Sequence, residues 1–214
     1  MSTSFPLPEW QSSAASSMVD VLTEDEWMEI ADVVALTGDR VPGWLQRLGI
    51  PKGWQLVTLP GKHELPLARV AVCGERADGG WEAAETISVF GYTGWPTFYE
   101  VLKKAVDTLR ALGARDIATK VLPIPPIQWT VALRNSGIAL IGGRPVWARD
   151  SNPVWVQQTT YVAGSEQPHA GRLIVHTMFV DAACRPLLGG EIAQVSDEVY
   201  RGFVGALRAE DPAG

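Results

Sequence analysis

The residues of this chain that could carry out chemistry do not stand in the patterns that nucleophilic catalysis or phosphate binding requires. The sequence has neither a GxSxG nucleophile elbow nor a GxGxxG dinucleotide fingerprint. Gly61-Lys62 is similar to the end of a P-loop, but His63 stands where a Ser or Thr hydroxyl must reach Mg²⁺. We therefore expect no catalytic residues and interpret the chain as more typical of a non-enzymatic protein.

The three histidines, His63, His169 and His176, do not have the spacing of an HExxH motif or of another short metal-binding motif. We therefore expect no metal and no cofactor. His176 lies inside the apolar run 173–180, and this position is more typical of a buried structural histidine than of a catalytic base.

Arginines and aromatic residues are the remaining candidates for binding a ligand or a partner. Four arginines on or beside predicted strands form either an anion-binding cluster or ordinary surface ion pairs: Arg134, Arg144, Arg149 and Arg172. The loop 91–96 joins two glycines and two aromatic residues to a helix start, whose free N–H groups attract anions. The alternative is a turn whose rings cover the core. The predicted binding residues are Tyr92, Trp95, Arg144, Trp147, Arg149 and Trp155.

Nine tryptophans are an unusual number for 214 residues. Tryptophan buries a large area per residue, so core and turn packing is one interpretation. The other is a ligand groove or a partner surface, where tryptophan is enriched. The nine stand at positions 10, 27, 44, 54, 81, 95, 129, 147 and 155.

The composition excludes several classes of partner and location. A net charge of −6 and a pI near 5.1 argue against a nucleic-acid-binding face and against an anionic membrane surface. We find no signal peptide and no apolar run long enough to span a membrane, so we expect a cytoplasmic protein. Cys73 and Cys184 belong to no CxxC pair, and we expect buried thiols rather than a disulfide.

The first 50 residues are predicted to be an arm and a helical appendage. Residues 1–20 are rich in Ser, Pro and Ala and have little periodicity. A helix is predicted from Thr23, where Glu26 completes a capping-box spacing, and its apolar face would contain Trp27, Ile30, Ala31 and Val34 before Gly38 ends it. This helix could pack across a homodimer interface.

The main domain is predicted to span residues 51–208, followed by a short tail at 209–214. Strands are expected at 54–59, 69–74, 85–90, 116–122, 129–134, 138–141, 146–148, 154–162 and 172–180, and helices from Thr97 to Leu112 and over 191–207. Strict βαβ alternation is missing. The order therefore predicts an α+β fold, a single mostly antiparallel sheet flanked by helices.

This order of elements resembles the actinobacterial LpqN/LpqT family, whose members look like the PsbP-type α/β/α sandwich. The stretches that carry the resemblance are Pro51–Trp54, 154–162, 171–177 and the closing helix 191–207. Unlike the lipoprotein members, this chain has no cysteine before Cys73, which implies a non-lipidated relative. The resemblance implies binding, chaperone or assembly work rather than catalysis.

Three hypotheses about function follow. The first is a binding or adaptor protein that holds a protein partner on its sheet face or beside the loop 90–96. The second is a small-molecule carrier or enzyme with a Trp-lined pocket, which would take an anionic or amphiphilic ligand near Arg144 and Arg149. The third is a homodimer subunit.

Overall fold

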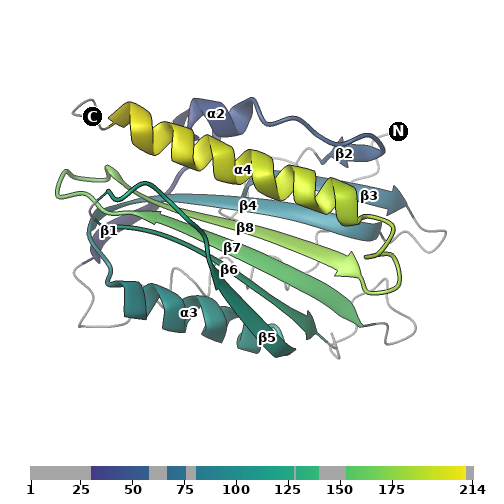
Figure 1. Cartoon of the computed structure of the whole chain (residues 1–214). Coiled ribbons are helices and arrows are strands. Elements are labelled where there is room, and N and C mark those ends of the chain that lie inside the picture. Colours follow the sequence, from purple (N-terminus) through teal and green to yellow (C-terminus); the bar gives the residue numbers. More distant parts are fainter. Residues whose placement is uncertain (1–29, 58–66, 76–80, 128, 140–152, 211–214) are drawn as a thin grey trace.

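The computed structural model describes residues 30–57, 67–75, 81–127, 129–139 and 153–210. These residues form an eight-stranded antiparallel sheet with a long helix on each face, as Figure 1 shows, so the predicted α+β sandwich is confirmed. The elements are β1 (Ile30–Ala35), a 3-10 turn (Gly38–Arg40), α2 (Gly43–Gln46), β2 (Trp54–Leu56), β3 (Leu67–Glu75), β4 (Trp81–Gly94), α3 (Phe98–Ala111), β5 (Ala114–Val121), β6 (Thr130–Ala139), β7 (Val154–Ala163), β8 (Gly171–Asp181) and α4 (Gly189–Glu210).

The last of the described strands lies in the middle of the sheet. The strand order is β2-β3-β4-β8-β7-β6-β5, so β8 pairs with β4 on one side and with β7 on the other. Nearly every residue of β8 is buried. The continuous apolar character of residues 173–180 is typical of a central strand covered on both faces, and β8 is such a strand.

The first described strand corrects a prediction. Ile30, Ala31 and Val34 were expected on a helix, but they lie in β1, which pairs antiparallel with the end of β4. A short run of β-branched residues is compatible with both the 3.6-residue period of a helix and the two-residue period of a strand. Hydrogen bonding to β4 makes this segment a strand. The register of β1 shifts between Ala31 and Val34, where Asp32 has a φ of 57°. The start of the predicted helix, residues 23–29, lies outside the described residues.

The segment after β1 packs onto the sheet as well. Leu36, Val41 and Leu45 are buried in one apolar cluster with residues of α4. Leu36 also donates its backbone N–H to the carbonyl of Val89, at 2.8 Å. The predicted boundary near residue 50 means that residues 51–208 fold without the first 50 residues. This stays a prediction, which a chain shortened to start at Ile50 tests.

Helix α3 confirms the clearest prediction from the sequence. Thr97 is the N-cap, and its side chain and Glu100 form a reciprocal capping box that satisfies the first free N–H groups. Val101, Ala105 and Leu109 recur at helical spacing and are buried against the sheet.

Strand β6 joins two segments that were expected to be separate strands. The predicted strands 129–134 and 138–141 were divided at Asn135-Ser136-Gly137, but β6 runs unbroken from Thr130 to Ala139. Gly137 is needed there because a Cβ atom would lie 2.8 Å from the carbonyl oxygen of Arg115 on β5. The strand predicted at 146–148 lies outside the described residues.

Candidate functional site

A groove of about 440 Å³ lies between α4 and the sheet face formed by β6 and β7. Arg134, Trp155 and Gln157 are contributed by the strands, and Ile192 and Ser196 by α4. The strand residues reach the same face because side chains alternate along a strand and register partners share a face. Arg134 is opposite Thr159, and Trp155 and Gln157 precede Thr159 at intervals of two residues. The turn that leads from β8 into α4 lines the groove with Ala182, Arg185 and Pro186.

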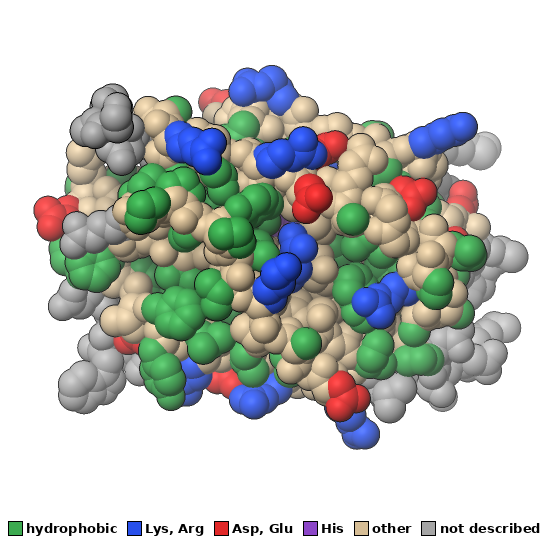
Figure 2. Space-filling model, viewed as in Figure 1, with side chains coloured by type: hydrophobic (Ala, Val, Ile, Leu, Met, Phe, Trp, Pro, Cys, Tyr) green, Lys and Arg blue, Asp and Glu red, His purple; other side chains and the backbone are tan. Residues whose placement is uncertain are grey.

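Two guanidinium groups make this groove positive. Arg185 stacks over the ring of Trp155, with its central carbon 4.4 Å from the ring centroid. Half-buried Arg134 donates from Nε to the hydroxyl of Thr159 at 3.4 Å. Among the described residues, no carboxylate lies within 4.0 Å of either guanidinium. Lys or Arg side chains stand near the middle of the face shown in Figure 2.

The wall and floor of the groove are joined by a buried hydrogen bond. Gln157 Nε2 on β7 donates to Ser196 Oγ on α4 at 2.9 Å, and both residues are buried. This bond fixes the orientation of the amide. The groove therefore combines two cations, a fixed amide, a hydroxyl and an indole ring, which together are suited to bind an anionic group.

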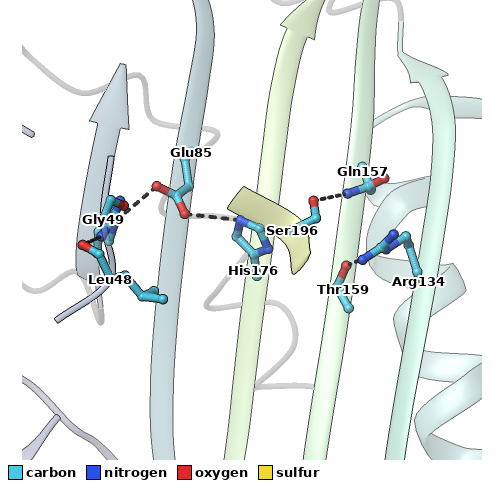
Figure 3. Close-up of polar contacts among 9 residues, drawn as sticks. Leu48, Gly49, Glu85, Arg134, Gln157, Thr159, His176 and Ser196 are labelled. Carbon is cyan, nitrogen blue, oxygen red and sulfur yellow. Dashed lines mark hydrogen bonds and ion pairs between the residues drawn. The ribbon is translucent and has the colours of Figure 1, made fainter. Parts of the chain in front are cut away.

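A row of polar side chains crosses the sheet beneath α4 and ends at the groove. We call Arg69, Glu85, His176, Thr159 and Arg134 the polar row; they lie on β3, β4, β8, β7 and β6. Figure 3 labels the last four of them. Arg69 Nε donates to Glu85 Oε2 at 3.0 Å, and the other Glu85 oxygen is 3.2 Å from His176 Nε2. The Glu85 and His176 side chains are completely buried.

Two opposing effects set the charge of Glu85. Burial alone would raise the pKa of its carboxyl, but the contacts with His176 and Arg69 outweigh burial and hold the pKa below its ordinary value. Glu85 is therefore ionised at neutral pH. Arg69 is held in turn, because its guanidinium also donates to the carbonyls of Leu48 and Gly49.

The structure places the predicted binding residues in different environments. Trp155 lines the groove, and Tyr92 is buried, with its hydroxyl donating to the carbonyl of Ala163 at 2.9 Å. Burial raises the pKa of Tyr92 above its ordinary value, in accord with a core role. Arg144, Trp147 and Arg149 lie outside the described residues. Whether the predicted residues bind a ligand or a partner stays a prediction.

Trp95 belongs to a different surface at the end of the molecule where α3 begins. Its ring stacks on Trp129, with centroids 5.4 Å apart, and Phe98 and Tyr99 are exposed on the first turn of α3. We call these four residues the aromatic surface. Hydrophobic side chains also gather on the left of the view in Figure 2, at this end. Trp129 has a φ of 62°, unusual for a bulky residue.

Sequence reasoning missed three of the groove residues. Gln157 and Ser196 are 39 residues apart, and only the position of α4 over β7 brings them together. Arg185 follows β8 in a turn whose path the sequence does not indicate. Arg134 was recognised as a possible anion ligand, but its predicted companions were other arginines. The alternation within 154–162, which places Trp155 and Gln157 on one face, was the available signal.

Other site chemistries find no support in the described part of the chain. No three His, Cys, Asp or Glu side chains there are grouped to hold a metal ion. Cys73 and Cys184 are not joined by a disulfide. Within the described residues, no helix is both long enough and apolar enough to cross a membrane.

Comparison with known proteins gives a likeness of structure. No family model matches the chain, and no curated protein matches it. Among solved structures, LpqN of Mycobacterium tuberculosis, described as involved in cell envelope biogenesis, matches with a TM-score of 0.58 and 16% sequence identity. The match covers 84% of this chain and 93% of the LpqN chain. At this identity the match shows a shared fold, which is the fold that the LpqN/LpqT resemblance implied.

Proposed function

We propose that this protein is a non-enzymatic binding protein that holds an anionic group of its ligand in the groove beneath α4. The observation that carries the proposal is the pair of guanidinium groups, Arg134 and Arg185, without a carboxylate partner among the described residues. Arginine without a counter-ion at a concave surface is well suited to a carboxylate, sulfate or phosphate. The volume of about 440 Å³ is that of a small-molecule site or of a pocket for a few side chains.

The residues of the groove favour binding over catalysis. Among the described residues, its charged and hydrogen-bonding side chains include Arg134, Arg185, Gln157 and Ser196, and none of the described lining residues is a histidine or a carboxylate that could act as a general base. His176 is completely buried beneath α4 and cannot reach a substrate. A binding role is also compatible with the likeness to LpqN, which is described as involved in cell envelope biogenesis.

Calorimetry with phenyl sulfate tests this proposal, because this probe has a fixed negative charge and a ring that can contact Trp155. We expect saturable binding that Arg134→Gln weakens by about tenfold or more, since a hydrogen bond to a charged group contributes roughly 1.5–3 kcal/mol. Arg208→Gln is the matched control, because Arg208 is an exposed residue near the end of α4 and not part of the groove. Absence of saturable binding, or equal losses in the two variants, would reject the proposal.

The aromatic surface favours a second candidate function, the docking of a protein partner. Tyr99 is 71% exposed and Trp129 is 44% exposed, although each ring would gain from burial. Gly164 allows Trp95 and Trp129 to approach each other closely, because a Cβ atom at position 164 would lie 2.9 Å from the Cβ of Trp95 and 3.0 Å from that of Trp129.

A photo-crosslinking residue placed at position 99 tests the second candidate in cells. We expect a specific adduct that Trp129→Ala abolishes and that the same crosslinker at position 208 does not form. An adduct that survives Trp129→Ala would contradict a role for this surface.

A further inference from the structure

Gln157 lies between the two guanidinium groups of the groove. On β7, Trp155, Gln157 and Thr159 follow one another at intervals of two residues, so their side chains share one face of the sheet. Arg134 is the register partner of Thr159 at one end of this series. Arg185 stacks over Trp155 at the other end. Diagonal neighbours on paired strands are about 7–8 Å apart, so a ligand held by Arg134 also meets the amide of Gln157.

The amide of Gln157 presents a hydrogen-bond acceptor to the ligand. Its Nε2 donates to Ser196 Oγ at 2.9 Å, which leaves Oε1 as the atom that is available in the groove. Within the described part of the chain, no donor contacts this oxygen. A carbonyl oxygen accepts a hydrogen bond from an N–H or an O–H group, and it repels the oxygens of an anion that has no proton to donate. A ligand that uses the whole groove therefore has a donor next to its negative charge.

We propose that the groove binds the C-terminus of a polypeptide partner. This inference rests on the proposed function, because it names the ligand class of the same site. The terminal carboxylate pairs with Arg134, since a guanidinium holds a carboxylate through two parallel hydrogen bonds. The N–H of the last residue is two bonds away from the carboxylate carbon, and it donates to Gln157 Oε1. One C-terminal residue thus supplies both the charge and the donor that the groove requires.

The rest of the groove is better suited to a peptide chain than to a free amino acid. The series from Trp155 to Thr159 extends over about 13 Å at ~3.3 Å per residue, which is the length of about four residues of extended chain. A free amino acid would bring its ammonium group close to two guanidinium groups, whereas the amide of a peptide is neutral. The lining also has apolar side chains, which predict apolar residues at the end of the partner: Trp155, Ala182, Pro186, Ile192 and Ala193.

Calorimetry with three short peptides tests the inference on the unaltered protein. The reference probe is acetyl-alanyl-alanyl-phenylalanine with a free C-terminal carboxylate. Its C-terminal amide lacks the negative charge, and its ester analogue has an oxygen atom in place of the last N–H and so lacks only the donor. We expect the reference peptide to bind saturably and each analogue to bind about tenfold more weakly, because the first loses a charged hydrogen-bonded pair and the second places an oxygen against Oε1.

Two variants connect each analogue to its partner in the groove. In Arg134→Gln the C-terminal amide should bind nearly as well as the reference peptide, because the guanidinium that distinguishes them is gone. In Gln157→Met the ester analogue should bind as well as the reference peptide, because the acceptor is gone while the volume of the side chain is kept. Arg208→Gln, near the end of α4, is the control and should retain both differences.

The outcomes separate this inference from the proposed function. If the ester analogue binds the unaltered protein as tightly as the reference peptide, or if Gln157→Met keeps the difference between them, the inference is wrong. If phenyl sulfate binds through Arg134 and the reference peptide does not bind, the proposed function stands and only this inference fails. If neither phenyl sulfate nor any of the peptides binds saturably, the proposed function fails and the inference with it.

Discussion

The same substitution at two glycines of α4 should change stability in opposite directions. Gly202 faces Trp44 of α2, and a Cβ atom there would lie 2.1 Å from Cε3 of the indole ring and 2.5 Å from Cζ3. At Gly205 the corresponding Cβ would meet no atom within 4 Å beyond its chain neighbours and the nearby backbone of α4. Both positions lie within the 22-residue helix α4, so each offers the same gain in helix propensity.

The magnitudes follow from propensity and overpacking. Alanine is favoured over glycine in a helix interior by roughly 0.5–1 kcal/mol, so Gly205→Ala should stabilise the protein by about that amount. Ordinary carbon contacts are about 3.5–4.0 Å, so the methyl group of Gly202→Ala must displace Trp44 by about 1.5 Å. Overpacking of this kind costs about 1–3 kcal/mol, and Gly202→Ala should therefore destabilise the protein by about 0.5–2 kcal/mol net.

Thermal unfolding followed by circular dichroism measures both effects. For a protein of this size 1 kcal/mol corresponds to roughly 2–4 °C, so the two variants should differ in Tm by at least about 3 °C with opposite signs. Adding Trp44→Leu to Gly202→Ala should recover part of the loss, as a coupling energy in a double-mutant cycle. If Gly202→Ala stabilises the protein as Gly205→Ala does, α2 does not pack on α4, and the packing of Val41 and Leu45 against that helix is wrong.

Three further predictions concern the core, the buried ion pair and the first strand. Leu109→Ala should destabilise the protein by about 3 kcal/mol in urea unfolding, because Leu109 is completely buried. Leu187 is 82% exposed, so the control Leu187→Ala should change stability by less than about 0.5 kcal/mol. Similar losses in the two variants would contradict the packing of α3. Glu85→Gln should cost about 3 kcal/mol at neutral pH, because it leaves Arg69 unpaired. The folded-state pKa of Glu85 is lowered, so the stability that its carboxylate contributes is complete above about pH 5 and is lost as pH falls through that lowered pKa. The free energy of unfolding should therefore fall less steeply in acid for Glu85→Gln than for the wild type. Parallel curves for the two proteins would refute the ion pair. A chain that starts at Ile50 lacks β1 and should expose the end of β4. We expect a lower Tm and a changed association state in light scattering. An unchanged Tm with an unchanged mass would show that residues 30–49 contribute nothing to the core.

Long periodic elements were predictable from the sequence because local residues decide them. The apolar spacing from Val101 to Leu109 specifies α3, and the continuous apolar run 173–180 specifies a strand buried on both faces. The capping box of Thr97 and Glu100 was also available in the sequence and would have located the first residue of α3.

Features that depend on pairing between distant segments were not predictable in the same way. The run from Ile30 to Val34 satisfies both helical and strand spacing, and only the free edge of β4 near Gly91 selects the strand. The groove requires the register of β6 on β7 and the path of α4 over both, and neither leaves a local pattern. For this reason the sequence indicated Trp155 and Arg134 separately but not that they line the same groove.

The central place of β8 has a consequence for how the protein is made. Among the described strands, β8 comes last in the sequence, and it separates β4 from β7, which both form hydrogen bonds to it. While the chain leaves the ribosome, β3 and β4 can pair early, and β5, β6 and β7 can form a separate sheet. Each of these sheets then has an unpaired, apolar edge until residues 171–181 emerge. A nascent chain that stops before Gly171 is therefore a candidate for chaperone binding and aggregation, and the full sheet cannot form until residues 171–181 have left the ribosome.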